Sequence, residues 1–496
     1  MENMTSPTLP TSEKKTAADM VADMPVSQDT PSFKISGVFG SHMVLQREKP
    51  IKIWGFSDAV GSEVCGCFAG ETVKTAVTED GRWDMTFSPQ RYNREGQPLV
   101  VADDRGNQVI LDDVLIGDVW LIGGQSNAEL NIAPCLSLTP SLEIYEEEPI
   151  RLFAQTQSYV YNNQGYCLEP QRDVINPDWC WKRPNEQAVH TFSAMGFYFA
   201  REVSKQTDVP LGMIMMAAGG ACIRELLPEA LAHEQGYDYG ANVREAGYYN
   251  ALINPLVGLA CKGMLFFQGE SEGGDRALAE KYDYEMALLI ADERVRFGQN
   301  FPLYYVQLSD YREEGARFFP YHDIIRIKQF DALKLIPDSA MVVDMDLGSP
   351  EDYPDWAHSP RKLELGERLA KVVLAREYSI GKEREMTSPM PCQAFLSPDG
   401  KRITVEFENV GSGLIVWGHS PVDSLGQSVE GFSLGDYDHR TPATATVTSR
   451  CAVVVDVPQG VEPTHVNYAY FMRVSCENAT LRGGNNLPVP AFSMPL

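Results

Sequence analysis

The sequence contains no run of about 18 apolar residues, the length that a transmembrane helix needs, so we expect no membrane span. Residues 1–32 lack the basic start and apolar stretch of a secretory signal, and their polar composition predicts a disordered tail. The ten cysteines form no C-x-x-C pair, which disfavours a zinc or redox site. Without an export signal, we expect free thiols and a cytoplasmic location.

Basic residues are scarce, with 42 Lys and Arg against 68 Asp and Glu, giving a net charge of −26. This negative charge repels nucleic acid and anionic membrane surfaces, so neither is expected as a partner. The sequence also lacks the H-E-x-x-H, P-loop and G-x-G-x-x-G motifs of metalloproteases and nucleotide-binding proteins. We therefore expect no metal and no cofactor, while a homo-oligomer is compatible with the sequence.

Three segments of different character follow the tail. Residues 33–113 are short β runs separated by Gly, Asp or Pro, which predicts a small antiparallel sandwich. Residues 114–382 alternate compact apolar strands with helical stretches, which predicts a doubly wound α/β domain with a parallel sheet. Residues 383–496 return to β runs, which either pair with the N-terminal strands or form their own sandwich.

Functional residues of an open α/β sheet gather beyond the carboxyl ends of its strands. The first predicted strand of the α/β segment ends in GDVWLIGGQSNAEL, where Ser126 follows a glycine pair. Backbone N–H groups at such a turn lie close to the serine hydroxyl, so Ser126 is a candidate nucleophile. The alternative is that Ser126 only caps a helix. The second strand ends in AAGGACIRE, where Gly219 and Gly220 either open N–H groups to a ligand or merely form a tight turn.

The third strand ends in FFQGESEGG, whose G-E-S-E-G matches the G-x-S-x-G pattern around many esterase nucleophiles. Two carboxylates, Glu270 and Glu272, flank Ser271 and would oppose the negative charge that develops on an oxyanion. Gln268 is neutral and carries amide N–H donors at the strand end. We therefore interpret this segment as contributing to an oxyanion hole through Gln268, with Ser271 as a helix-start residue.

The last strand of the α/β segment is followed by DWAHSPRKLELGERLAK. Ser359 and Pro360 predict an N-cap and a first helical position, which would hold His358 just ahead of the helix. Asp355 lies three residues earlier, and a D-x-x-H turn can set a carboxylate against Nδ1 while Nε2 faces a serine, as in a Ser-His-Asp triad. The alternative is a solvated loop histidine. His322 is a weaker candidate because no matching strand end precedes it.

From about residue 38 onward, a series of ordered blocks resembles the sialate O-acetylesterase family of SGNH (GDSL-like) hydrolases. The blocks are SHMVLQREKPIKIWGF, GDVWLIGGQSN, VPLGMIMMAAGGA, YNALINPL with FFQGESE, and DWAHSPRKLELGERLA. The resemblance implies an SGNH-hydrolase domain, a flavodoxin-like three-layer α/β fold, between N- and C-terminal β-sandwich segments. It also implies a carbohydrate O-acetylesterase that works without a metal.

Carried over to this chain, the resemblance makes Ser126 the nucleophile, His358 the general base and then the acid, and Asp355 the residue that orients the histidine. It further implies that Asn127 and Glu270 support the site or contact the sugar.

The resemblance implies an oxyanion hole made of the Ser126 N–H, a glycine N–H and the Gln268 side chain. Gly220 is the expected glycine, with Gly219 as the alternative.

Several residues around the expected pocket depart from the family pattern and bear on the substrate: Ala128, Ala221, Cys222, Phe266, Phe267 and Ser359. The expected substrate is an acetylated mono- or oligosaccharide, either a sialate or an imported xylo- or manno-oligosaccharide. Two alternatives stay open: an esterase for lipid or thioester acyl chains, and a non-catalytic glycan-binding protein on an esterase scaffold.

Overall fold

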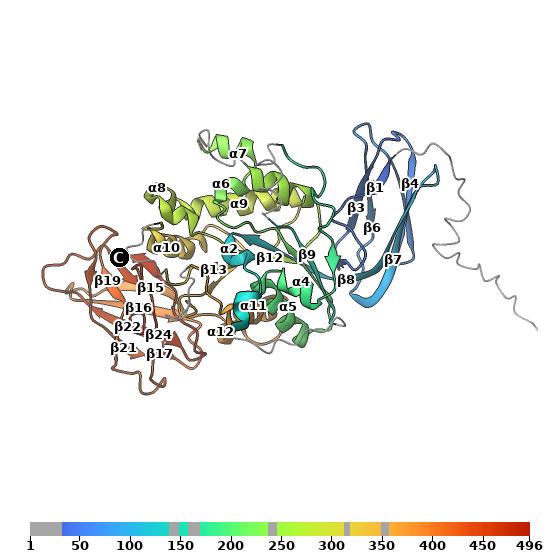
Figure 1. The fold of residues 1–496 in the computed structure, drawn as a ribbon. Helices are drawn as coiled ribbons and strands as arrows, with labels where there is room; N and C mark the ends of the chain where they lie inside the picture. Colours follow the sequence, from blue (N-terminus) through green and yellow to red (C-terminus); the bar gives the residue numbers. More distant parts are fainter. Residues whose placement is uncertain (1–31, 138–147, 157–168, 237–245, 312–317, 349–356) are drawn as a thin grey trace, which may run out of the picture.

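A computed structural model of the chain describes residues 32–137, 148–156, 169–236, 246–311, 318–348 and 357–496. Residues 1–31 of the predicted tail, and Asp355, lie outside these ranges. An N-terminal β region, a central α/β region and a C-terminal β region follow one another along the molecule (Figure 1). The two β regions lie at opposite ends and share no sheet among the described strands, so the C-terminal strands do not pair with the N-terminal ones.

The N-terminal region consists of two facing antiparallel sheets. One contains β1 (Phe33–Ile35), β3 (Ile51–Ser57) and β6 (Arg82–Phe87). The other contains β4 (Glu63–Phe68), β5 (Glu71–Ala76), β7 (Asn93–Asp103) and the first part of β8 (Gln108–Gly124). Their inner faces are close: a Cβ on Gly66 would lie 2.2 Å from the sulfur of Met85. The rings of Phe68 and Phe87 meet edge to face at 6.0 Å, as packed aromatic pairs prefer.

Strand β8 continues from the N-terminal region into the central sheet. Its first part pairs antiparallel with β7, and its second part pairs parallel with β11 (Leu211–Met215) and β12 (Gly263–Phe267). The short strand β2 (Val44–Gln46) lies parallel to its middle. The boundary drawn between residues 113 and 114 therefore falls inside one continuous strand.

The central sheet has the order β10-β9-β11-β8-β12-β13-β14. The strands not yet given are β9 (Ile150–Ala154), β10 (Trp181–Lys182), β13 (Leu303–Gln307) and β14 (Ser339–Val343). All neighbours are parallel except β9 and β10, so the predicted parallel α/β sheet is confirmed. Counted from β8, the five strands from β11 to β14 have the flavodoxin-like order 2-1-3-4-5, whose switch point lies between β8 and β12.

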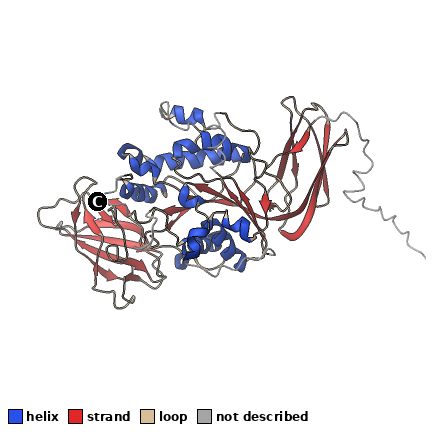
Figure 2. Ribbon diagram, in the orientation of Figure 1, coloured by secondary structure: helices blue, strands red, loops and turns tan. Residues whose placement is uncertain are grey.

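Helices cover both faces of this sheet and give it three layers (Figure 2). On one face α5 (Ala194–Gln206) packs against α11 (Lys362–Glu377), and on the other α9 (Tyr282–Phe297) packs against α10 (His322–Ala332). The first pair approaches closely because Gly366 of α11 lies against α5, where a Cβ would be 2.7 Å from that of Tyr198. The shorter helical segments are α2 (Ser126–Glu129), η1 (Ala133–Ser137), α4 (Glu186–His190), α6 (Ile223–Leu226), α7 (Glu229–Glu234), η3 (Tyr249–Ile253), η4 (Asn254–Leu256), η5 (Ser271–Gly274), α8 (Arg276–Ala279) and α12 (Glu383–Met386).

The C-terminal region contains three sheets with the orders β15-β16-β22-β21-β18, β20-β19-β23-β25 and β17-β24. Their strands are β15 (Met390–Leu396), β16 (Arg402–Glu408), β17 (Leu414–Val416), β18 (Ser428–Val429), β19 (Phe432–Leu434), β20 (Thr441–Pro442), β21 (Ala445–Ser449), β22 (Ala452–Asp456), β23 (His465–Tyr468), β24 (Leu481–Gly483) and β25 (Phe492–Pro495). The ring of Phe492 stacks on Tyr468 and also reaches Phe330 of α10, at 6.0 Å. Gln307, at the end of β13, exchanges two 2.9 Å hydrogen bonds with the backbone of Ala491. These contacts fix the region against the central sheet.

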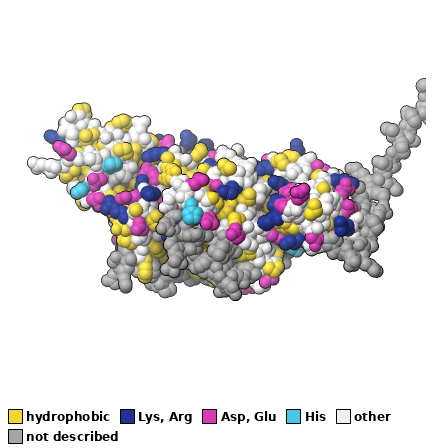
Figure 3. Space-filling view, turned by 90° about the horizontal axis from the view of Figure 1, so that it is seen from above, with side chains coloured by type: hydrophobic (Ala, Val, Ile, Leu, Met, Phe, Trp, Pro, Cys, Tyr) yellow, Lys and Arg dark blue, Asp and Glu magenta, His cyan; other side chains and the backbone are white. Residues whose placement is uncertain are grey.

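Acidic and basic side chains are interspersed on the face shown in Figure 3. No helix in the described ranges is long and apolar enough to cross a membrane. The nine cysteines within those ranges are free thiols, as predicted.

One buried acid in α9, Glu293, makes the stability of the folded protein depend on pH. Glu293 is 2% exposed, and its Oε2 has no hydrogen-bond partner. Burial, with a contribution from Asp292, raises the pKa of Glu293 from 4.5 to about 8. Because the native state then binds this proton more tightly than the unfolded chain, the associated stability is present below about pH 4.5 and is lost as the pH rises towards 8.

We expect Glu293→Gln to remove this loss, because the amide has no proton to release. Relative to the unsubstituted protein, its melting temperature should increase more at about pH 9 than at about pH 5. Thermal denaturation followed by circular dichroism at both pH values measures this. Val295→Ala, which changes an exposed side chain of the same helix, is the control, and an equal shift at both pH values in Glu293→Gln would contradict the prediction.

Candidate active site

Ser126 begins helix α2 directly beyond the carboxyl end of β8. The turn before it needs glycine: Gly124 has a φ of +124°, and a Cβ there would lie 2.0 Å from the carbonyl oxygen of Phe267 on β12. Gln125 is the N-cap residue, so capping does not account for Ser126. The hydroxyl oxygen of Ser126 lies 2.7 Å from Nε2 of His358, and the structure thus brings together the predicted nucleophile and base.

His358 lies in the segment that leads into α11. The predicted N-cap at Ser359 is wrong: α11 begins at Lys362, and Arg361 precedes it as the N-cap residue. The hydroxyl of Ser359 instead donates to the backbone oxygen of Leu347 and accepts a 3.2 Å hydrogen bond from the Arg361 N–H. Ser359 therefore fixes the turn beside the histidine rather than the helix itself.

The two other predicted acid–base positions differ in outcome. Asp355, the expected partner of the histidine, lies outside the described residues. His322, the weaker candidate, is buried, with its Nε2 3.2 Å from the backbone oxygen of Ser309 and its ring stacked on Tyr311 at 5.2 Å. Burial holds the pKa of His322 well below its ordinary value, so this histidine is a neutral core residue.

The glycine turn after β11 has one N–H with no acceptor among the described residues. The Gly219 N–H donates to the carboxylate of Glu129 at 2.9 Å, so it is already used. Gly220 has a φ of +71°, and no described residue accepts from its N–H. The Ala218 N–H donates to the Gly124 oxygen at 3.0 Å, which ties this turn to the end of β8. Of the two glycines, Gly220 is the one available to a ligand.

Gln268, the predicted oxyanion-hole side chain, is held by several contacts within the protein. Its side-chain nitrogen donates to the Ala221 oxygen at 3.0 Å and to Glu272 at 2.5 Å, and it also lies 3.2 Å from the Gln125 side-chain oxygen. Its two N–H groups thus face three acceptors within the protein. These contacts tie the glycine turn to the end of β12, and the contact of Gln268 with an oxyanion stays a prediction.

Ser271 is bonded to backbone, not to a histidine. Its hydroxyl donates to the Gly220 oxygen at 3.1 Å, and no described histidine contacts it. Glu272 accepts a 2.6 Å hydrogen bond from the Ile223 N–H, and burial raises the pKa of Glu272 to about 7 although its hydrogen bonds lower it. The G-x-S-x-G match thus lies at the start of η5, and Ser271 is the first residue of that short helix, as interpreted from the sequence.

A buried polar cluster lies beneath the serine and the histidine. Asn127, 4% exposed, donates to Glu270 at 2.5 Å and to the backbone oxygen of Ala357 at 3.1 Å. Its oxygen accepts a 2.7 Å hydrogen bond from the ammonium of Lys362, which is 1% exposed and lies 4.7 Å from the Phe267 ring centroid. The amide nitrogen and oxygen of Asn127 are therefore both engaged within the protein.

Burial raises the pKa of two carboxyl groups in and beside this cluster, those of Glu270 and Asp344. Burial raises the pKa of Glu270, against the effects of the Asn127 hydrogen bond and of the His358 and Lys362 charges. Burial likewise raises the pKa of Asp344, at the end of β14, to about 7, and Lys362 opposes this shift.

Two residues of this site were given no role from the sequence. Lys362 falls in the block DWAHSPRKLELGERLA, whose spacing fits the family, but nothing in the pattern shows that its ammonium is buried against Asn127. Glu129 has no signal beyond its place in the GQSNAEL block.

No group of three or more His, Cys, Asp or Glu side chains suited to a metal ion occurs in the part of the chain that the structure describes. A serine paired with a histidine beside an open backbone N–H is an arrangement suited to acyl transfer.

Comparison with known proteins identifies the family. The family model described as carbohydrate esterase, sialic acid-specific acetylesterase, matches residues 116–375. The human sialate O-acetylesterase is 26% identical over 384 residues, which cover 68% of this chain and 70% of that protein. The orangutan (Pongo abelii) sialate O-acetylesterase matches with the same identity and coverage. A crystal structure of a carbohydrate acetylesterase from Xanthomonas citri superposes with a TM-score of 0.76 at 26% identity, covering 93% of this chain and 99% of that one.

The family model spans more than half of the chain and includes both Ser126 and His358. The chain therefore belongs to the sialic acid-specific acetylesterase family of carbohydrate esterases.

Proposed function

We propose that this protein hydrolyses acetyl esters on sugars through an acyl-enzyme formed on Ser126. The 2.7 Å contact between Ser126 Oγ and His358 Nε2 carries the proposal. The contact lies at the carboxyl ends of the strands, where ligands bind in open α/β sheets. Membership of a carbohydrate esterase family supports an acetylated carbohydrate, of the sialate type, as the substrate class.

In the first half-reaction, Ser126 Oγ attacks the acetyl carbonyl carbon while His358 Nε2 accepts the hydroxyl proton. The carbonyl oxygen becomes an oxyanion, for which the N–H groups of Ser126 and Gly220 are the proposed donors. Such fixed donors stabilise the charge without reorganising in the transition state. The protonated His358 then donates its proton to the sugar oxygen, and the sugar alcohol leaves.

In the second half-reaction, His358 accepts a proton from a water molecule that attacks the acetyl-serine carbonyl. The tetrahedral species collapses, Ser126 recovers its proton from His358, and acetate leaves. Asp355 is proposed to hold Nδ1 of His358 in both halves, as the D-x-x-H spacing predicts.

The buried cluster is proposed to position the histidine. Asn127 holds the backbone oxygen of Ala357, the residue directly before His358, and Lys362 with Glu270 fixes the orientation of the Asn127 amide. Three hydrogen bonds that meet at Asn127 would thus hold His358 opposite Ser126, and a misplacement of about 1 Å there costs roughly 10²-fold in rate.

Replacing either member of the contact pair is expected to stop turnover. Ser126→Ala removes the nucleophile and His358→Ala removes the base, so acetate release from p-nitrophenyl acetate should fall to background in both while circular dichroism shows an intact fold. Ser271→Ala is the matched control and should keep substantial activity. Near-normal activity in Ser126→Ala, or loss of activity only in Ser271→Ala, would reject the assignment.

Removing the Gln268 side chain tests its supporting role. Gln268→Ala frees the glycine turn, so kcat should decrease with little change in KM. The decrease should be smaller than the roughly 10²–10³-fold that follows loss of a direct oxyanion donor. Steady-state kinetics measure both constants. An increase in KM at constant kcat would instead make Gln268 a substrate-binding residue.

Lys362→Met tests the positioning of His358. The thioether chain fills similar space but no longer holds the Asn127 oxygen, so kcat should decrease by about 10²-fold with KM changed only a few-fold. The profile of kcat against pH should also change, because Glu270 loses a neighbouring cation. Lys371→Met, which changes an exposed lysine of the same helix, is the control. Equal kinetics in both variants would show that the cluster does not position His358.

A further inference from the structure

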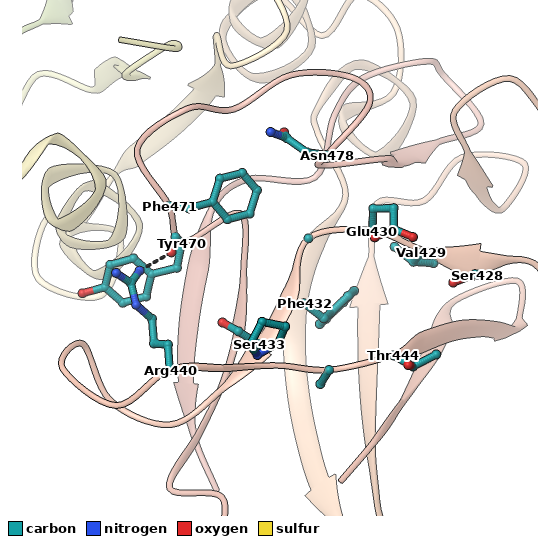
Figure 4. A pocket seen from close by; sticks show the side chains of 13 residues that line it. Ser428, Val429, Glu430, Phe432, Ser433, Arg440, Thr444, Tyr470, Phe471 and Asn478 are labelled. Atoms are coloured by element: carbon teal, nitrogen blue, oxygen red, sulfur yellow. Dashed lines mark hydrogen bonds between the residues drawn. The ribbon is translucent and has the colours of Figure 1, made fainter. Parts of the chain in front are cut away.

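A hollow lies in the C-terminal β region, away from the Ser126 site (Figure 4). Its volume of about 610 Å³ is in the range of roughly 300–1,000 Å³ that small-molecule sites occupy. It is bounded by strand β19 with the residues before it, by the segment that follows β20, and by residues 470–478. None of its lining residues belongs to the Ser126 site.

Aromatic side chains form the apolar part of the hollow. The half-buried ring of Phe471 is directed into the space between Asn478 and Phe432 (Figure 4). Phe432 is 4% exposed, and its ring packs on Tyr468 at 5.0 Å, so it forms a fixed floor. The backbone oxygen of Phe471 accepts a hydrogen bond from the buried guanidinium of Arg326 in α10, so the segment that carries this ring is anchored.

The polar part of the hollow carries little net positive charge. Arg440 is the one cation among the described residues that line it. Its guanidinium lies 3.2 Å from Asp323 and 4.8 Å and 4.2 Å from the ring centroids of Tyr437 and Tyr470. The carboxylate of Glu430 is exposed at the rim. An anionic ligand would therefore meet a paired cation and an unpaired negative charge.

Hydroxyl and amide groups surround the aromatic part. Ser433 and the exposed Thr444 lie on one side, and Asn478 lies on the other (Figure 4). Such groups exchange hydrogen bonds with ligand hydroxyls, while the negative face of an aromatic ring attracts the C–H groups of a pyranose ring. The combination fits a ligand that is neutral, rich in hydroxyl groups and apolar on one face.

We propose that this hollow binds a neutral segment of an oligosaccharide, with Phe471 as the stacking platform. The proposal rests on the proposed function, because the bound segment would belong to the glycan whose acetyl groups reach Ser126. A net charge of −26 further disfavours a nucleotide or another polyanion as the occupant.

One helix connects the hollow to the Ser126 site. In α10, Arg326 donates to the backbone of the Phe471 segment, and Gln329 donates to the Gln268 backbone oxygen at 3.0 Å. Arg276, just after the Ser271 turn, forms a two-fold hydrogen-bonded pair with Asp438 at 2.9 and 3.0 Å. The hollow is thus held at a fixed position relative to the site, so a glycan bound in it would raise the local concentration of acetyl groups.

Binding is tested in the Ser126→Ala protein, which cannot turn over a substrate. Calorimetric titration with unacetylated xylohexaose and mannohexaose should show binding of at least one of them. Adding Phe471→Ala should weaken it by about tenfold, the upper end of what one aromatic contact contributes. Thr444→Val keeps the shape of the hollow and should weaken binding by a smaller factor. Phe395→Ala, at a 50% exposed phenylalanine that does not line the hollow, is the control.

Kinetics then separate the hollow from the catalytic proposal. Phe471→Ala should raise KM for an acetylated xylo-oligosaccharide or manno-oligosaccharide and leave hydrolysis of p-nitrophenyl acetate unchanged. Lack of binding to both hexaoses, or equal binding in Phe471→Ala, would overturn the proposal. Hexaose binding that needs Phe471, in a protein that releases no acetate from any ester, would support the hollow and reject the esterase.

Discussion

The close parallel pairing of β8 with β12 is the constraint on which the site depends. Gly123 and Gly124 lie opposite Phe266 and Phe267, and there is no room for a side chain at Gly124. Because the two backbones pack so closely, both strands end at the same edge of the sheet. The segments that follow them therefore begin next to each other. Ser126 leaves one strand end and Gln268 leaves the other, so one backbone contact fixes both halves of the site.

Much of this arrangement could be predicted because it follows from short local patterns in the sequence. Apolar strands separated by helical stretches predicted the parallel sheet, and GGQSN and D-x-x-H marked Ser126 and His358 as candidates. The contacts of Gln268 could not be predicted, since a strand end tells where a side chain begins but not which acceptors surround it. Glu272 and the Ala221 carbonyl come from the turn after Gln268 and from the loop after β11, and only the folded chain brings them to its amide.

The same reasoning explains the other differences. The serine before Pro360 has the pattern of an N-cap, yet its hydroxyl is taken by Leu347, and α11 starts later. The continuity of β8 was hidden because a composition boundary between β and α/β segments need not interrupt a strand. Lys362 illustrates a further limit, because a lysine in a helix that carries many charged residues gives no sign that its own ammonium is buried.

Because β8 belongs to both the N-terminal region and the central sheet, the folding of one depends on the other. The first part of β8 pairs with β7, its middle pairs with β2, and its last residues lead directly to Ser126. Cutting the chain near residue 113 would remove the partners of residues 114–117 of β8, and such an exposed strand edge promotes aggregation. The N-terminal sheets thus share a strand with the region that carries the candidate site. We expect local unfolding of the N-terminal sheets to disorder the end of β8 as well, so the N-terminal sheets and the central sheet should unfold as a single cooperative unit.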